Sequence, residues 1–186
     1  TGSNASLRIA VDGSSAGGSS LFTVGSGQAS VRGLNLRNGG NAGILFNGGS
    51  NHSVEGCFIG TGISGTGDQG NAGIGVTSSV NGVQVGGPGL HQRNVISGNN
   101  GAGISLSGNN WLVQNNVIGT AADGTTALGN VFGGVAAAGT GGRVIGNRIR
   151  NNATRGIGLS ASAVQVEISA NQVFSNAGLG IDLNND

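Results

Sequence analysis

The chain has 186 residues, and 41 of them are glycine, which is about three times the usual share. Eight arginines, no lysines and seven acidic residues leave a formal net charge of +1, while 36% of the residues are hydrophobic. These values exclude an intrinsically disordered chain, which requires low hydrophobicity and a high net charge. They also argue against general nucleic-acid binding, which depends on basic patches, and no apolar run is long enough to span a membrane.

Short segments with apolar residues at every second position run along the whole chain, as expected for β-strands. They begin with Ile9 and Val11, followed by Phe22 and Val24. From residue 31 onwards three apolar columns recur in a fixed order. The first contains Val31, Val54, Val85, Val113, Val144 and Ile168, the second Leu36, Ile59, Ile96, Ile118, Ile149 and Val173, and the third, with a glycine before each member, Ile44, Ile74, Ile104, Val135, Ile157 and Ile181. No stretch has the spacing of an amphipathic helix, so we expect essentially no helix.

Three short strands per unit, separated by Gly, Asn and Ser corners, predict an all-β fold, a parallel β-helix of about seven coils. Equivalent strands of successive coils would pair at roughly 4.8 Å, which explains why like residues recur in columns. Residues 1–186 then form a single β-helix domain. The terminal coils obey the same pattern and no amphipathic capping helix is visible, so we expect a segment of a longer solenoid or end-to-end self-association.

One polar column lies at a corner between strands. It contains Asn94, Asn116, Asn147 and Asn171, preceded by Leu34 and Cys57 in the earlier coils. Asparagine tolerates the left-handed backbone of such a corner, and stacked amides can pair into a ladder along the axis. We therefore interpret these asparagines as structural. Cys57 is expected to be a small buried residue of the same column, and a single cysteine excludes an internal disulfide.

Two fifteen-residue stretches, 57–71 and 116–130, share seven identical positions. We expect each to span a corner with an inserted loop, in coils that are two apart, while the coil between them carries its insertion at Val83–Ser97. The two loops should project from one side, about 10 Å apart by the coil rise. A structural role is the simpler interpretation, and a ligand or calcium site is the alternative.

The stretches RNVISGNNGAGISL, NNVIGTAADGTTALGN and VIGNRIRNNATRGIGL resemble the repeats of right-handed parallel β-helix proteins, the pectate-lyase-like superfamily. The two Gly/Thr loops resemble repeat segments of large bacterial secreted or surface proteins. The resemblance covers nearly the whole chain and implies a right-handed helix. It is specific for fold and poor for function, because the matching residues are those that build coils.

Enzymes of this superfamily use clustered carboxylates, with arginine or lysine bases in lyases and Tyr, His and Asp in epimerases. The seven carboxylates here are Asp12, Glu55, Asp68, Asp123, Glu167, Asp182 and Asp186. On the columns no two fall in adjacent coils on one face, with Glu55 and Glu167 outward on the third strand. His52 is expected to be half-buried packing and His91 a solvated loop residue. We therefore predict no catalytic residue, no metal and no cofactor.

The one charge cluster is Arg143, Arg148, Arg150 and Arg155. Arg148 and Arg150 flank the inward Ile149 and should point outward on the first strand, on the face that carries the saccharide groove in related enzymes. Gln172 should lie beside Arg148, with Asn151 and Asn152 at the adjoining turn. Arginine forks bind carboxylate or sulfate groups, so the candidate ligand-binding residues are Arg148, Arg150, Arg155 and Gln172. A solvated basic patch is the alternative.

The sequence therefore predicts a structural or interaction module of a secreted or cell-surface protein, with acidic or neutral polysaccharide as the expected partner. The rival hypothesis is a polysaccharide-active lyase, hydrolase or epimerase.

Overall fold

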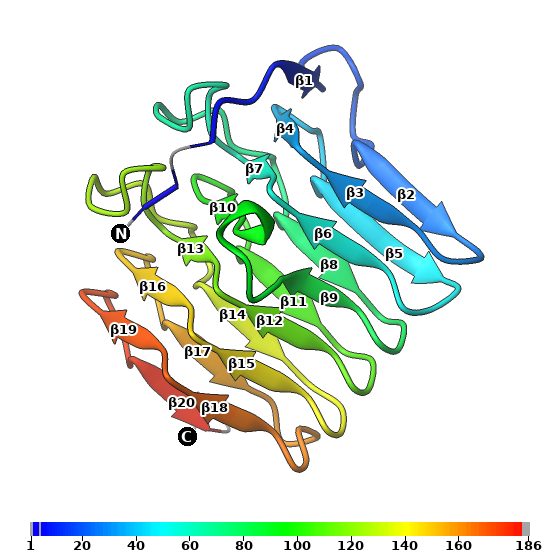
Figure 1. Ribbon diagram of the computed structural model, residues 1–186, viewed down its shortest axis with the longest axis vertical. Coiled ribbons are helices and arrows are strands. Elements are labelled where there is room, and N and C mark those ends of the chain that lie inside the picture. Colours follow the sequence, from blue (N-terminus) through cyan, green and yellow to red (C-terminus); the bar gives the residue numbers. More distant parts are fainter. Residues whose placement is uncertain (1, 4, 184–186) are drawn as a thin grey trace.

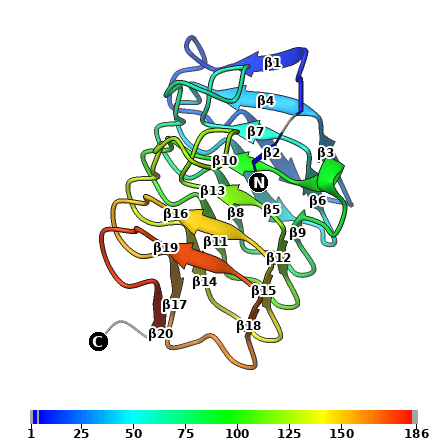
Figure 2. The ribbon, with the colours of Figure 1, turned by 60° about the vertical axis from the view of Figure 1, so that its left-hand side comes forward.

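The computed structural model describes residues 2–3 and 5–183. The chain winds as a solenoid in which each coil contributes one strand to each of three parallel sheets, and the N-terminal coil lies at the opposite end from the C-terminal coil (Figure 1). In Figure 2 the sheet that runs from β1 to β19 is seen as a regular stack of short strands along the axis. The predicted parallel β-helix with three strands per coil is confirmed.

The sheets are named A, B and C in the order in which a coil visits them. Sheet A contains β1 (Ile9–Asp12), β4 (Leu34–Arg37), β7 (Phe58–Ile59), β10 (Val95–Ile96), β13 (Val117–Ile118), β16 (Arg148–Arg150) and β19 (Gln172–Phe174). Sheet B contains β2 (Phe22–Gly25), β5 (Ile44–Gly48), β8 (Val76–Ser78), β11 (Ile104–Leu106), β14 (Val135–Ala137), β17 (Ile157–Leu159) and β20 (Ile181–Leu183). Sheet C contains β3 (Ser30–Arg32), β6 (Ser53–Glu55), β9 (Gln84–Gly86), β12 (Leu112–Gln114), β15 (Arg143–Ile145) and β18 (Glu167–Ser169).

The strand register confirms the first two apolar columns. Val31, Val54 and Val85 pair in succession in sheet C, and Leu36 pairs with Ile59 in sheet A. The third column is wrong at one member, because β8 places Val76 and not Ile74 beside Ile44 and Ile104. Both residues follow a glycine, so the alternation of apolar residues alone does not distinguish the two registers.

Inward residues of all three sheets form one continuous hydrophobic core. Trp111 is 1% exposed, and its indole N–H donates to the carbonyl of Ala138 at 2.8 Å. His52 stacks on Phe46 with ring centroids 4.3 Å apart and is fully buried. The expectation of a half-buried histidine was therefore wrong in degree, because the ring fills an inward position of the core.

The predicted asparagine ladder is present and every member is hydrogen bonded. Asn94 Nδ2 donates to Asn116 Oδ1 at 2.9 Å, and the same contact links Asn116 to Asn147 and Asn147 to Asn171 at 3.0 Å. The ladder ends at Cys57, whose backbone N–H donates to Asn94 Oδ1 at 2.8 Å. Each amide thus connects neighbouring coils, and Asn94, Asn116 and Asn147 are at most 1% exposed, where unpaired groups would be costly.

A second ladder, which sequence reasoning missed, stands at the corner between sheets A and B. Its Nδ2-to-Oδ1 contacts of 2.8–3.0 Å join Asn71, Asn99, Asn130, Asn152 and Asn176. Each of these residues lies five positions before its sheet B strand begins. That constant spacing was the available signal, and it also assigns Val76 to its column.

The two Gly/Thr loops follow β7 and β13, with β10 between them, as predicted. Each is closed by an antiparallel bridge, Thr61 with Asp68 and Thr120 with Ala127. The expected separation of about 10 Å was wrong, because the backbone N–H of Ala122 donates to the carbonyl of Gly65 at 2.8 Å. The loops lean towards each other along the axis and cover the coil between them.

Helical structure in the described part of the chain is confined to one 3-10 turn, Leu90–Gln92, which lies in the predicted insertion after β9. None of the described helical structure is long and apolar enough to cross a membrane.

Candidate functional site

The outward face of sheet A contains two columns of side chains. The strand register places Asn35, Phe58, Val95, Val117, Arg148 and Gln172 in the first column. Arg150 and Phe174 pair in the second column, two residues further along their strands. The face therefore changes along the axis from apolar residues in β7, β10 and β13 to basic, amide and aromatic residues in β16 and β19.

The apolar half of this face is covered. Phe58, Val95 and Val117 point away from the main core, yet they are at most 1% exposed. They form a second hydrophobic cluster with Ala122 from the second loop and with Leu7 from the N-terminal segment. The N-terminal segment thus crosses the face of sheet A, where it passes in front of β7 and β10 (Figure 2).

The uncovered half begins at Arg148. The Cζ atoms of Arg148 and Arg150 lie 5.7 and 4.6 Å from the centroid of the Phe174 ring, which is within the range of cation–π contacts. Phe174 remains 40% exposed. The Nε atoms of both arginines are shielded from solvent and have no hydrogen-bond partner within the described part of the chain. The predicted outward direction of Arg148 and Arg150 and the neighbouring position of Gln172 are thus observed.

Arg155 does not join this pair. It precedes β17, and Nη1 donates to Asp182 Oδ2 at 2.8 Å on the outer side of sheet B. Its side chain lies across Gly158, where a Cβ atom would come within 2.2 Å of Arg155 Nε. Grouping Arg155 with Arg148 and Arg150 was therefore wrong, because neighbours in sequence across a corner lie on different faces.

Arg143 also lies apart from this pair, whereas Asn151 and Asn152 follow β16 at the adjoining turn, as predicted. Arg143 lies on sheet C, where Nε donates to Glu167 Oε2 at 2.8 Å. Asn152 is 1% exposed as a member of the second ladder and is buried away from the outer surface. Asn151 occupies the left-handed corner beside it with φ 59°.

The remaining carboxylates of the described residues do not form a cluster, and each interacts with its own partner. Asp12 pairs with Arg37 at 2.9 Å, and Glu55 pairs with Arg32 at 3.4 Å. Glu55 is outward as expected but only 6% exposed. Within residues 2–3 and 5–183 no group of three or more His, Cys, Asp or Glu residues could hold a metal ion. The seventh carboxylate, Asp186, lies outside the described residues.

Hydrogen bonds lower the pKa values of two turn carboxylates. The backbone N–H of Ser14 and the side chain of Asn38 lower the pKa of Asp12 to about 2. In the second loop, the hydroxyl and backbone N–H of Thr126 and the backbone N–H of Thr125 lower the pKa of Asp123 to about 2. Asp123 thus closes its own loop, which supports the structural interpretation of the Gly/Thr loops.

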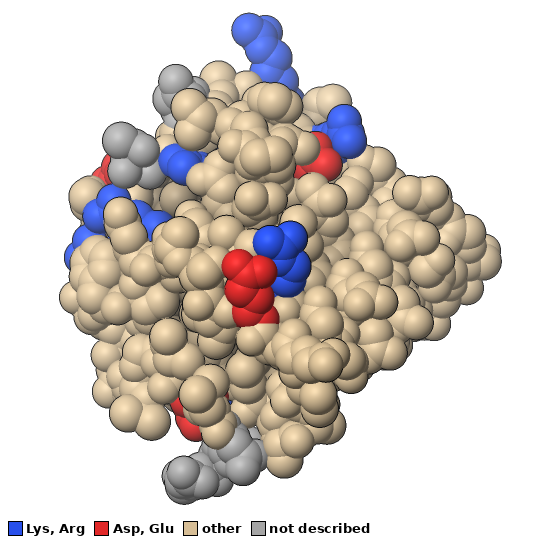
Figure 3. All heavy atoms as spheres, turned by 60° about the horizontal axis from the view of Figure 1, so that its bottom comes forward, with Lys and Arg blue, Asp and Glu red and all other residues tan. Residues whose placement is uncertain are grey.

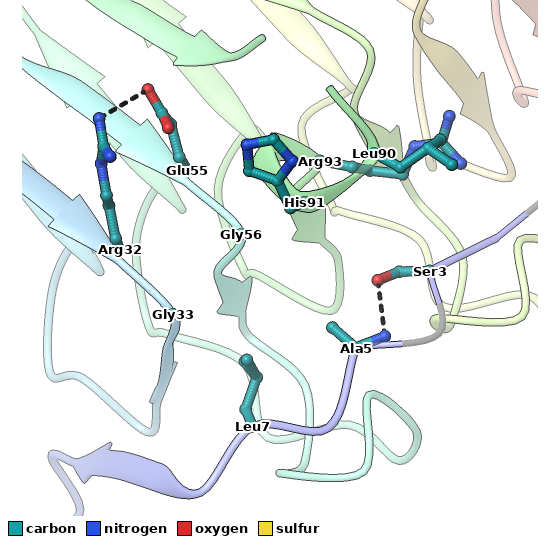
Figure 4. Close-up of a pocket in the computed structure, with 10 residues that line it drawn as sticks. All are labelled: Ser3, Ala5, Leu7, Arg32, Gly33, Glu55, Gly56, Leu90, His91 and Arg93. Atoms are coloured by element: carbon teal, nitrogen blue, oxygen red, sulfur yellow. Dashed lines mark hydrogen bonds and ion pairs between the residues drawn. The ribbon is translucent and has the colours of Figure 1, made fainter. Parts of the chain in front are cut away.

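A groove of about 650 Å³ lies between the N-terminal segment and the corner of sheets C and A. Figure 4 shows Ser3, Ala5 and Leu7 on one side and Arg32 with Glu55 and His91 on the other. Sequence reasoning missed this groove, because it joins residues that are far apart in the chain. A smaller hollow of about 120 Å³ lies at the junction of the covered and uncovered halves of sheet A, between Arg93 and Arg148.

Charged side chains are sparse elsewhere. Figure 3 looks towards the C-terminal end and shows a surface that is mostly uncharged. Cys57 is buried, and burial raises the pKa of its thiol to about 11, consistent with the predicted packing role.

Comparison with known proteins agrees with this architecture. No curated protein and no solved structure matches the chain significantly. The family model described as a right-handed beta helix region matches residues 19–186. This range includes β2–β20 and both asparagine ladders. The chain therefore belongs to the right-handed β-helix family.

Proposed function

We propose that this chain is a structural and interaction module of a secreted or cell-surface protein, and that it binds the anionic groups of an acidic saccharide on the open half of sheet A. Arg148 and Arg150 would hold a carboxylate or sulfate group. Phe174 would contact the apolar face of a sugar ring, and the Gln172 amide would bind a hydroxyl group.

The observation that carries this proposal is that Arg148 and Arg150, unlike four other arginines, have no acidic partner among the described residues. Arg32, Arg37, Arg143 and Arg155 each have an acidic partner within 4 Å. Arg148 and Arg150 have none among the described residues, although their Nε atoms are shielded and unbonded. A shielded donor without a partner is costly. An incoming oxyanion would supply the missing acceptor with charge-assisted hydrogen bonds.

The structural part of the proposal is supported by the two ladders. Buried amide contacts tie successive coils together at two of the three corners, and all three sheets run the length of the described chain. Such a scaffold holds Arg148 and Arg150 on regular strand backbone, so the site would lose little entropy on binding. The likeness of the Gly/Thr loops to repeat segments of large bacterial secreted or surface proteins supports the proposed location.

The test is a calorimetric titration with oligomers of galacturonic acid and with a neutral glucan, each with and without calcium. We expect Arg148→Ala with Arg150→Ala to weaken uronate binding at least tenfold. The charge-matched control is Arg32→Ala with Arg143→Ala, which removes two exposed arginines from sheet C and should leave the affinity unchanged. An equal loss in both double variants would contradict the proposal.

The same samples test the alternative of a polysaccharide-active enzyme. Unsaturated uronides or new reducing ends above the level of a mock preparation would demonstrate cleavage. Binding without product is the outcome that the proposed function predicts.

A further inference from the structure

We propose that the open half of sheet A takes the end of a saccharide chain and not its interior, an inference that rests on the proposed function. The covered half ends at β13, where the segments that cover Val117 form a steric barrier, called the wall below. A saccharide on Arg148 and Arg150 that ran along the axis towards the N-terminus would meet this wall within one coil.

The wall is built from outward side chains that the fold itself has closed over. Val117 pairs with Arg148 in the strand register and is therefore its direct neighbour on the face. Val117 is 1% exposed, whereas Arg148 is only half-buried. The change from open to closed thus occurs between two adjacent strands, at a distance of about 4.8 Å.

Hydrogen bonds fix the cover in place. Arg93 Nη1 donates to the carbonyl of Gly2 at 2.8 Å, and its Nε donates to the carbonyl of Asn115 at 3.1 Å. The backbone N–H of Ser3 donates to the carbonyl of Ala122 in the second loop at 2.5 Å. Leu7 packs on the apolar cluster beneath. The N-terminal segment and the second loop therefore act as one cover over Phe58, Val95 and Val117.

A hollow lies directly at the foot of the wall. Its volume is about 120 Å³, and its lining includes Arg93, Val117, Arg148 and Gln172. The hollow is large enough for a terminal carboxylate or hydroxymethyl group but too small for a chain to pass through. Arg93 lines this hollow together with Arg148. Its Nε, Nη1 and Nη2 already donate to Asn115 and Gly2, so it adds positive charge without a free edge. Arg148 remains the guanidinium that a terminal anionic group would meet.

The binding of end groups can be separated from the binding of chain interiors by length. We would compare galacturonic acid oligomers of one to six residues with the long polymer, at equal mass of sugar. End binding predicts that the affinity per molecule levels off after two or three residues and that the polymer competes in proportion to its chain ends. Equal competition per sugar residue at every length would overturn the inference while leaving the proposed function intact.

A variant tests the wall itself. Leu7→Ser removes the apolar anchor of the cover, and we expect it to raise binding of the polymer at least threefold at equal mass. Arg8→Ser, a change at the neighbouring exposed position, is the matched control and should have no effect. Unchanged polymer binding by a folded Leu7→Ser protein would contradict the role of the cover, and if that variant fails to fold, the length series with the unaltered protein still decides.

Failure of the two proposals is distinguishable. If no uronate of any length binds the unaltered protein, both are wrong. If long and short chains bind equally per sugar residue and the arginine double variant abolishes binding, only the end-group inference is wrong.

Discussion

Replacing Asn116 with leucine should weaken the fold more than the loss of a single hydrogen bond would suggest. Asn116 is 1% exposed and lies in the middle of the first ladder. Its Oδ1 accepts from Asn94 Nδ2 at 2.9 Å and from the Asn94 backbone N–H at 3.3 Å. Its Nδ2 donates to Asn147 Oδ1 at 3.0 Å and to the carbonyl of Val85 at 2.8 Å.

The loss of unfolding free energy depends on which buried polar groups are left with no hydrogen-bond partner at all. Asn94 Nδ2 keeps its contact with the carbonyl of Val54, and Asn147 Oδ1 keeps the backbone N–H of Asn116. The Asn94 backbone N–H loses the acceptor to which it donates and stays buried, which costs about 1–3 kcal/mol. With the weakening of the remaining contacts, we expect a total of about 2–4 kcal/mol.

The assay is thermal and urea unfolding of Asn116→Leu beside Asn100→Leu. Asn100 is exposed and is therefore a suitable control. The exposed Asn110 would be a poor control, because its left-handed φ of 55° would strain a leucine. For a chain of this size each kcal/mol lowers Tm by about 2–4 °C, so we expect a fall of roughly 4–16 °C for Asn116→Leu and almost none for Asn100→Leu. Equal shifts in the two variants would refute the ladder argument.

Four further predictions concern other parts of the molecule. Asn130→Leu should lower Tm by an amount similar to Asn116→Leu, because it interrupts the second ladder; a shift no larger than that of Asn100→Leu would show that this ladder contributes little. Since the folded-state pKa values of Asp12 and Asp123 are lowered to about 2 from 3.8, both carboxylates stabilise the fold above about pH 4 and lose this contribution as the pH falls towards 2. Asp12→Asn with Asp123→Asn should therefore flatten the acid limb of a stability-against-pH curve, and an unchanged limb would contradict it. The Cys57 thiol should react with a thiol reagent at pH 8 only after unfolding, and rapid labelling of the native protein would show that the chain opens locally beside β7. Because β18, β19 and β20 each have one strand neighbour in the described structure, we propose end-to-end association, which should raise the sedimentation coefficient with concentration; a constant value would argue against it.

The sequence predicted the stacking of coils well, because an inward position in one coil is adjacent to the same position in the next. Val54, Ile59 and Ile96 are fully buried in the columns to which they were assigned. The ladder residues Asn94, Asn116 and Asn147 were found for the same reason. A misassignment arose where the chain offered two apolar residues of the same phase, Ile74 and Val76.

The candidate site could be predicted only in part. Alternation along β16 placed Arg148 and Arg150 outward, since Ile149 has to face the core. Which arginines already have an acidic partner depends on the register between coils, and this register removed Arg155 from the site. The covered half of sheet A could not be foreseen, because Leu7 and Ala122 reach Phe58 through segments outside the repeat pattern.

Saccharide binding on the open half of sheet A can be tested by mapping backbone amide chemical shifts in the ¹⁵N-labelled protein during a titration with a galacturonic acid trimer. We predict saturable changes at Arg148, Arg150, Gln172 and Phe174, on β16 and β19, and unchanged amide shifts in sheets B and C. Saturable changes centred on sheet B, or no changes anywhere at millimolar trimer, would contradict it.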